Sequence, residues 1–305
     1  MKAGTNLEKV LESGKFGVTA EAGPPKGTSA ATIQKKGELL RHCCDAVNVT
    51  DNQTAIVRMS SLAGCLLLKQ EGVDPVMQMV VRDRNRLALQ ADVLGAVALG
   101  IGNLLCLSGD HQKFGNHPTA KGVFDIDSMQ LIQTLKAMRD EKKFLSGEDI
   151  SGEVPLYIGA AANPFADPFE FRVSRLAKKI KAGANFIQTQ AVYDVDRFAK
   201  WMEMAAERGL TEQTHILAGV IPIKSAGMAR YMRDYVPGVI VPDEIVTRME
   251  QAENAKEEGV RIILEIVEQL KEIPGVHGIH IMAVGWEDIV PEMVEKAGLM
   301  PRPVV

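Results

Sequence analysis

The stretch that decides the fold is Phe16-Gly-Val-Thr-Ala-Glu-Ala-Gly-Pro-Pro-Lys-Gly27. Val18 and Thr19 are β-branched and follow a glycine, which indicates a strand. The strand must end at Gly23-Pro24-Pro25, because proline cannot donate a hydrogen bond to a ladder. Glu21 is therefore expected at the carboxyl end of a strand, just before a stiff turn. In this stretch alone, a solvated loop glutamate is the commoner interpretation, and a glutamate fixed at a pocket is the alternative.

The composition sets the broad class of the protein. A chain of 305 residues can form one large α/β barrel or two smaller domains. The net charge of −4 gives no reason to expect nucleic acid or an anionic membrane as a partner. Apolar runs are shorter than a membrane span, and residues 1–17 lack the apolar core of a signal peptide. We therefore expect a cytoplasmic protein with no membrane span.

The cysteines argue against a disulfide framework or a metal centre. The chain has four, at Cys43, Cys44, Cys65 and Cys106, and none of them forms a Cys-x-x-Cys pair. Zinc and iron–sulfur sites need ligand spacings that these positions do not supply. We expect buried, reduced thiols and no metal site.

Short apolar runs alternate with helical patterns along the whole chain. The expected strands are a first strand up to residue 21, then 46–50, 75–81, 103–107, 156–162, 186–189, 216–220 and 277–282. The expected helices are 6–13, 31–43, 60–70, 87–99, 127–141, 170–182, 195–208, one from 225, 242–271 and 287–297. The segment 142–153 is polar and is expected to be a connection.

Repeated strand–helix units of this kind predict an α/β fold, specifically a (β/α)8 barrel of the TIM type. We expect residues 1–305 to form a single domain, with a short N-terminal helix and a helical insert near 242–271. A doubly wound open sheet is the main alternative. The first strand is not followed by Gly-x-Gly-x-x-Gly, which disfavours a dinucleotide-binding sheet of that type.

Active sites of such barrels lie at the carboxyl ends of the strands. The polar residues expected there include Glu21, Thr50, Ser108, Asp110, Asn163, Gln188 and Gln190. Two carboxylates in different environments can divide an acid role and an electrostatic role. His111 and His117 share one loop and are expected to be solvated. The residues alone predict a barrel enzyme that acts on a polar, flat, heteroaromatic ligand.

Three segments together resemble the methylenetetrahydrofolate reductase family. They are Val18-Thr-Ala-Glu-Ala-Gly-Pro-Pro-Lys26, Leu107-Ser-Gly-Asp110 and Lys179-Ile-Lys-Ala-Gly-Ala-Asn-Phe-Ile-Gln-Thr-Gln-Ala-Val-Tyr-Asp194. They occur in the family's order and span most of the chain. The chain length and the ending Gly278-Ile-His-Ile-Met-Ala-Val-Gly-Trp286 are similar to the catalytic subunit of reductases from anaerobic acetogens.

The resemblance implies a flavin-dependent reduction of 5,10-methylenetetrahydrofolate to 5-methyltetrahydrofolate by hydride transfer. It assigns Glu21 as the acid that protonates N10 of the folate, which reverses the interpretation of Glu21 as a loop residue. It places Asp110 near the pterin and the flavin, and Gln190 on the pterin. Thr50 and Lys179, together with Ser108 and Asn163, are implied to contact the flavin. FAD is the family's usual flavin, and FMN is also compatible with these residues.

One departure from the family pattern concerns the electron donor. The aromatic residue that stacks on nicotinamide or folate is replaced by Ala226, and aromatic positions after the glutamine become Ala191 and Val192. These changes weaken a nicotinamide site, and the resemblance to the acetogen subunits implies an electron-delivering partner subunit that carries metal clusters. The alternative is a homo-oligomer that NADH reduces directly. Two other functions stay open: a pterin-binding barrel methyltransferase without flavin, and a non-catalytic subunit of a larger complex.

Overall fold

A computed structural model of the chain describes residues 1–236 and 238–305. Its strands are all parallel and close into a barrel in sequence order. They are β1 (Gly17–Ala22), β2 (Ala46–Val49), β3 (Pro75–Val80), β4 (Asn103–Leu107), β5 (Tyr157–Ala162), β6 (Phe186–Ala191), β7 (His215–Val220) and β8 (Val276–Ile281). Because β1 also pairs with β8, the predicted barrel is confirmed and the open sheet is excluded.

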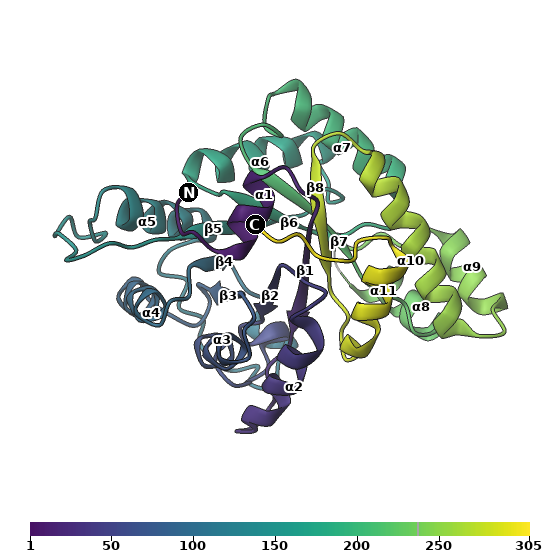
Figure 1. Ribbon diagram of the computed structural model, residues 1–305, viewed down its shortest axis with the longest axis horizontal. Helices are drawn as coiled ribbons and strands as arrows, with labels where there is room; N and C mark the ends of the chain where they lie inside the picture. The colour runs from purple at the N-terminus through teal and green to yellow at the C-terminus, as the bar shows by residue number, and fades with distance from the viewer. Residues whose placement is uncertain (237) are drawn as a thin grey trace.

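Helices surround the sheet (Figure 1). They are α1 (Asn6–Glu12), α2 (Ala30–Leu40), α3 (Ser61–Gln70), α4 (Arg86–Ala98), α5 (Ser128–Asp140), α6 (Phe169–Ala182), α7 (Val195–Glu207), α8 (Ala226–Tyr235), α9 (Asp243–Gln251), α10 (Ala255–Glu272) and α11 (Val290–Lys296). Three 3-10 turns are η1 (Gln53–Ala55), η2 (Gln112–Phe114) and η3 (Glu287–Ile289). The segment expected as an insert consists of α9 and α10, and α10 packs against α7, α11, β7 and β8.

Several elements differ from their predicted bounds, and the helix expected over 31–43 ends at Leu40. Strand β6 continues to Ala191 through a register shift against β7, where the prediction ended at residue 189. The last helix is divided into η3 and α11, where one helix over 287–297 was expected. Pro291 explains the division, because a proline nitrogen cannot donate to the carbonyl of Glu287 and so cannot continue an α-helix that begins there.

The amino-terminal end of the barrel interior is closed by apolar side chains. Leu7 and Leu11 of α1 pack with Tyr157 and Phe186 inside the sheet, and all are buried. The rings of Tyr157 and Phe186 stack with their centroids 5.2 Å apart. A Cβ on Gly159 would lie 2.3 Å from the Phe186 ring, so only glycine fits beneath it. This packing leaves the opposite end of the barrel available for a ligand.

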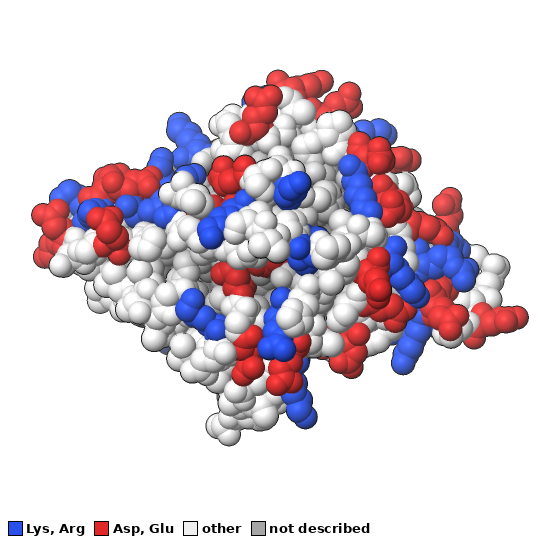
Figure 2. All heavy atoms as spheres, viewed as in Figure 1, with Lys and Arg blue, Asp and Glu red and all other residues white. Residues whose placement is uncertain are grey.

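The outer surface carries both signs of charge. On the face drawn in Figure 2, lysine and arginine side chains alternate with aspartate and glutamate, most densely over α9, α10 and α11. Across the described ranges, none of the helices is both long enough and apolar enough to cross a membrane.

Candidate active site

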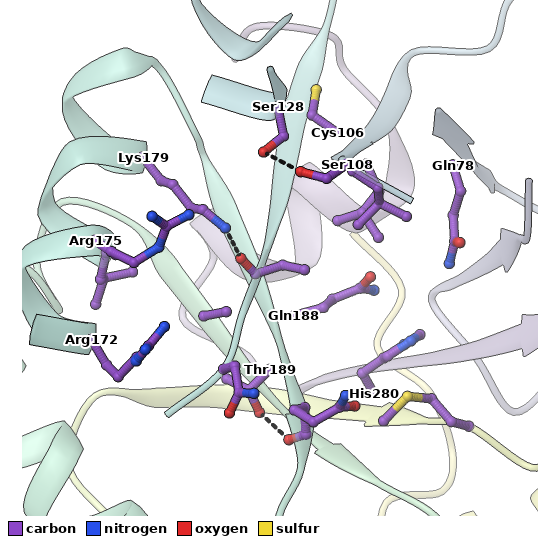
Figure 3. A pocket seen from close by; sticks show the side chains of 18 of the residues that line it. Gln78, Cys106, Ser108, Ser128, Arg172, Arg175, Lys179, Gln188, Thr189 and His280 are labelled. Carbon is purple, nitrogen blue, oxygen red and sulfur yellow. Dashed lines mark hydrogen bonds between the residues drawn. The ribbon is translucent and has the colours of Figure 1, made fainter. Parts of the chain in front are cut away.

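A cavity of about 400 Å³ opens at the carboxyl ends of the strands. Its lining, most of which is drawn in Figure 3, comes from β1, β3 to β6, β8, α5, α6 and the residues that follow the strands. Among the residues predicted from the sequence, the lining includes Glu21, Ser108, Asn163, Lys179 and Gln190. Closure of the barrel therefore brings together side chains from four different strands and one helix.

Glu21 lies on the cavity wall with its side chain only 13% exposed. Gln78 Nε2 donates a hydrogen bond of 3.0 Å to Glu21 Oε1. His280 Nε2 lies 3.6 Å from the same oxygen. A carboxyl group placed this way faces a ligand on one side and two polar side chains on the other, which favours the pocket interpretation over the loop interpretation.

A buried polar chain continues behind His280. His280 Nδ1 lies 2.9 Å from Thr19 Oγ1. Gln188 Nε2 donates to Thr19 Oγ1 at 3.1 Å and to Asn48 Oδ1 at 3.0 Å. Asn48 Nδ2 returns a hydrogen bond of 2.7 Å to Gln188 Oε1. Side chains from β1, β2, β6 and β8 thus form one network inside the barrel.

Three cationic side chains form one wall of the cavity. Arg172, Arg175 and Lys179 are three and four residues apart on α6, so they project from the same face of the helix. Figure 3 shows them on one side of the cavity. Burial, and then the nearby Arg175, lowers the pKa of Lys179 to about 8. Lys179 Nζ donates to the Ala161 carbonyl oxygen, which is not a counter-anion. Because burying a cation without a counter-anion is unfavourable, Lys179, with the half-buried Arg172 and the exposed Arg175, suits a negatively charged ligand.

The remaining polar lining is held by local hydrogen bonds. Ser108 Oγ lies 3.2 Å from Ser128 Oγ, which ties the end of β4 to the first turn of α5. Asn163 Oδ1 accepts the Phe165 N–H at 2.9 Å. The amide nitrogen of Asn163 and the second lone pair of its Oδ1 can still form hydrogen bonds with a ligand.

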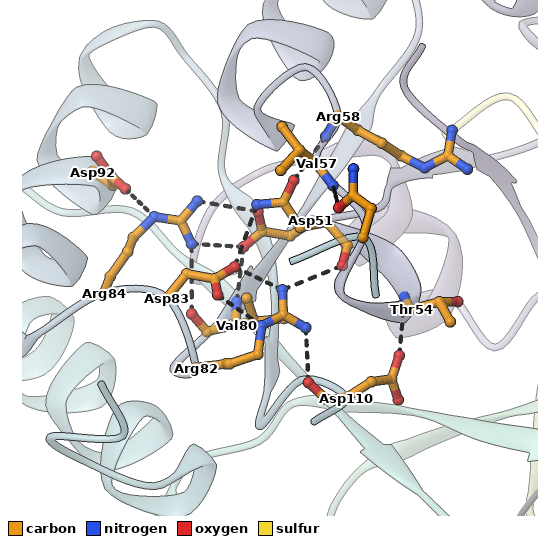
Figure 4. A network of polar contacts seen from close by, with 12 residues as sticks. Asp51, Thr54, Val57, Arg58, Val80, Arg82, Asp83, Arg84, Asp92 and Asp110 are labelled. Carbon is orange, nitrogen blue, oxygen red and sulfur yellow. Dashed lines mark hydrogen bonds and ion pairs between the residues drawn. The ribbon is translucent and has the colours of Figure 1, made fainter. Parts of the chain in front are cut away.

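Asp110 and Thr50 lie outside the lining of this cavity. Asp110 is exposed, and its Oδ2 accepts the Thr54 N–H at 3.0 Å. Arg82, only 2% exposed, donates to the carbonyl oxygens of Asp110 and Asn52 at 3.0 and 3.2 Å (Figure 4). The hydroxyl of Thr50 is buried and has no hydrogen-bond partner within residues 1–236 and 238–305. The roles of both residues stay predictions.

The network in Figure 4 holds an unusual loop after β2. Asn52, Thr54 and Ala55 have φ values of 44°, 57° and 55°, a region that non-glycine residues rarely occupy. Arg82 holds Asn52, and Asp110 holds the Thr54 amide. Such strain persists only where surrounding contacts impose it. Asp110 therefore helps to hold the strained loop in place at the mouth of the barrel.

Sequence reasoning missed several polar lining residues, among them Gln78, His280, Arg172 and Arg175. Gln78 and His280 are polar residues within otherwise apolar strands, and this was the signal that could have identified them. The arginines share helical spacing with Lys179, which was a second signal. Neither signal says which residues meet, because that depends on how the barrel closes.

The structure also revises the argument about nicotinamide. Ala191 and Val192 are fully buried, so they cannot be counted as aromatic surface missing from the mouth. Ala226 is the first residue of α8 and is half-buried. The expectation of a weak nicotinamide site therefore depends on Ala226 alone.

All four cysteines are buried free thiols. Apart from residue 237, which is not described, the chain shows no group of three or more His, Cys, Asp or Glu side chains arranged to hold a metal ion.

Solved structures resemble the chain in fold. One is an uncharacterized protein from Clostridium thermocellum that binds two copies of 5-methyl-5,6,7,8-tetrahydrofolic acid, with a TM-score of 0.65, 15% identity and coverage of 96% of this chain and 98% of that one. Another is an F420-dependent secondary alcohol dehydrogenase in complex with an F420-acetone adduct, with a TM-score of 0.54, 14% identity and coverage of 93% and 99%.

Curated relatives share more sequence. Methylenetetrahydrofolate reductase 1 of Schizosaccharomyces pombe is 25% identical over 236 residues, which are 75% of this chain and 36% of that protein. A probable methylenetetrahydrofolate reductase (NADPH) of Caenorhabditis elegans is 23% identical over 251 residues, which are 80% and 35%. The chain thus spans about a third of the length of these relatives. The family model for methylenetetrahydrofolate reductase matches residues 6–298, and the chain belongs to that family.

Proposed function

We propose that this chain reduces 5,10-methylenetetrahydrofolate to 5-methyltetrahydrofolate with a flavin bound at the mouth of the barrel. Family membership supports folate as the substrate, and so does the 5-methyltetrahydrofolate bound by the similar Clostridium thermocellum barrel. The observation that carries the proposal is the position of Glu21, a mostly buried carboxyl group on the cavity wall with two polar side chains behind it.

Glu21 would act as the acid. Opening the one-carbon bridge to a 5-iminium cation requires a proton on the leaving N10, and a positioned carboxyl group can supply it. The proton leaves a carboxylate behind in a poorly solvated place. Gln78 already donates to that carboxylate's Oε1, and His280 Nε2 is close enough to stabilise it further. These contacts strengthen as charge develops, which is the property that accelerates a reaction.

The residues present fit a flavin. Arg172, Arg175 and Lys179 form a cationic wall that suits its phosphate. Thr50, which the resemblance also implies, is buried after β2 and lies outside this lining. Reduced flavin, when bound, supplies the hydride. Lys179 would hold the phosphate as a point charge, while the arginines add directed donors. The cations are compatible with FAD and with FMN.

Gln190 and Asp110 would complete the folate site. Gln190 lines the cavity and has an amide suited to the donor and acceptor edge of a pterin. Asp110 would contribute negative charge that favours the iminium cation. Its carboxylate is exposed and keeps an acceptor oxygen free while Oδ2 holds the Thr54 amide.

The experiment that tests the function is anaerobic purification followed by a flavin assay and turnover of methylenetetrahydrofolate with several reductants. We expect bound flavin and formation of 5-methyltetrahydrofolate with a chemical donor such as reduced viologen. Folate binding without flavin would favour the pterin-binding methyltransferase instead. Bound flavin without turnover by any donor would favour a non-catalytic subunit.

We also propose that a partner subunit with metal clusters delivers the electrons, because Ala226 offers no ring to stack on nicotinamide. Flavin-loaded chain mixed anaerobically with excess NADH or NADPH should bleach slowly. Rapid bleaching by either nucleotide without a partner would favour the alternative, a homo-oligomer that NADH reduces directly.

A further inference from the structure

The polar network behind Glu21 contains an amide pair, one member of which, Gln188, also lines the cavity. Asn48 on β2 and Gln188 on β6 exchange two hydrogen bonds, of 2.7 and 3.0 Å, across the barrel interior. They are 0% and 3% exposed. A reciprocal pair in a buried place fixes both amides, because breaking it would leave polar groups unsatisfied.

The fixed amide of Gln188 determines in which direction the hydroxyl of Thr19 donates its hydrogen bond. Gln188 Nε2 donates to Thr19 Oγ1 at 3.1 Å, so this hydroxyl already accepts one bond. Its single hydrogen then has two acceptors within reach, His280 Nδ1 at 2.9 Å and the Ile279 carbonyl at 3.4 Å. The shorter contact is the better hydrogen bond. Thr19 therefore donates to His280 Nδ1.

A neutral histidine that accepts at Nδ1 carries its proton at Nε2. His280 Nε2 is the atom that faces Glu21 Oε1 at 3.6 Å. If both amides of the pair were reversed, Thr19 would donate to Gln188, and His280 would carry its proton at Nδ1. The lone pair on Nε2 would then face a glutamate oxygen that already accepts from Gln78, which is repulsive.

We propose that Gln188, held by Asn48, is a positioning residue that fixes the Nε2–H tautomer of His280 through Thr19, so that a donor faces Glu21. The inference rests on the proposed function for its consequence, the stabilisation of the carboxylate left when Glu21 gives up its proton. Its structural content concerns the free protein and needs neither flavin nor folate.

The test is nitrogen-15 NMR of the full chain labelled at histidine, because the two ring nitrogens shift differently in the two tautomers. The His280→Asn variant assigns the signal among the six histidines. We expect His280 to carry its proton at Nε2 in the unliganded protein at a pH where it is neutral. A proton at Nδ1 would overturn the proposal without touching the proposed reaction.

Variants test the role of the amide. Gln188→Met keeps the length of the side chain and removes the donor, so the ratio of Nε2–H to Nδ1–H should fall roughly five- to tenfold, the net worth of one hydrogen bond. Thr19→Ser keeps the hydroxyl and should keep the ratio. Ile187→Val is the matched control, since Ile187 is a neighbouring buried residue of β6 that packs in the helix–sheet core. An unchanged ratio in folded Gln188→Met would contradict the proposal. If Gln188→Met does not fold, the ratio is measured in Thr19→Val, which lacks the hydroxyl and should also lower it.

Turnover separates this inference from the proposed function. If the reaction is as proposed, Gln188→Met should lower kcat several-fold and change the KM for folate by a smaller factor, because Gln188 acts through His280 as well as lining the cavity. If the wild-type chain has no turnover, the NMR result still decides the tautomer.

Discussion

The two ends of the barrel interior are filled by opposite kinds of side chain. At the amino-terminal end, Leu7, Tyr157 and Phe186 form a closed, mainly apolar plug. At the carboxyl end, Glu21 and His280 belong to a hydrogen-bonded polar network beside an open cavity. The same strands supply both ends, so one set of strands can place its stabilising contacts and its reactive groups separately. Substitutions at the two ends should therefore change different measurements.

The largest effect is expected at the open end. Glu21→Gln should bind flavin normally but lose folate turnover by roughly 10²–10⁴-fold, because an amide cannot protonate N10. Stopped-flow oxidation of the reduced flavin by methylenetetrahydrofolate measures this loss. Glu12→Gln makes the same chemical change at an exposed position on α1 near the closed end and should leave turnover unchanged. Near-normal turnover of Glu21→Gln at saturating folate would remove Glu21 from the acid role.

At the closed end, Phe186→Ala should destabilise the protein and spare the cavity's chemistry. Removing a fully buried ring that stacks on Tyr157 should cost about 3–5 kcal/mol in the free energy of unfolding. Denaturant unfolding measures the cost, and flavin binding of the folded fraction checks that the mouth is intact. A loss below about 1 kcal/mol would show that the plug is not a main source of stability.

The cationic wall gives an effect that depends on pH. Because the pKa of Lys179 is lowered to about 8, affinity for FMN should be flat between about pH 7 and 8, where the phosphate is fully ionised, and fall above pH 8 by up to about tenfold per pH unit as the amine loses its charge. Lys179→Met should remove this slope and weaken FMN binding at pH 7 by roughly 10- to 150-fold.

Lys178→Met is the control for that experiment, because Lys178 lies over the Phe171 ring and does not line the cavity. Fluorescence titration at several pH values measures both variants. A pH slope that survives in Lys179→Met would assign the titration to another group.

Asp110 should show a smaller effect. Asp110→Asn keeps an oxygen that can accept the Thr54 N–H, so the loop should stay in place while one charge is lost. We expect a folate half-reaction about tenfold slower and a higher flavin potential, because less negative charge opposes reduction. Spectroelectrochemistry and stopped-flow measure the two. Asp125→Asn, which removes a charge from an exposed ion pair with Arg86, should change neither.

The smallest effect concerns acid stability at the closed end. Burial, and then the neighbouring His215, lowers the pKa of His277 to about 4. The unfolded chain binds this proton more readily, so the contribution is complete above about pH 6.5 and is lost as the pH falls toward 4. We expect a loss of about 1–2 kcal/mol, allowing for partial exposure. Denaturant unfolding at several pH values measures this loss. His277→Asn should make the free energy of unfolding depend less on pH between about 6.5 and 4. The same pH dependence in this variant and in the wild type would contradict the assignment.

The sequence predicted the strands well because each is a short apolar run bounded by glycine, proline or polar residues. The position of Glu21 followed from Gly23-Pro24-Pro25 alone, and the structure confirms a strand that ends at Ala22. The polar partners of Glu21 did not follow. Gln78 and His280 are far from it in the chain, and nothing in a linear pattern says that strands three and eight turn these side chains toward strand one.

The sequence by itself determined local features. These are the segments that form strands, the residue at which each strand ends, and the polar residues at those ends. Hydrophobic periodicity and turn chemistry act within a few residues, so they can be read along the chain. Only the closed barrel decided that Lys179 joins Glu21 at one cavity while Asp110 and Thr50 lie outside its lining. Barrel closure fixes the register of all eight strands together, and that register determines which side chains meet.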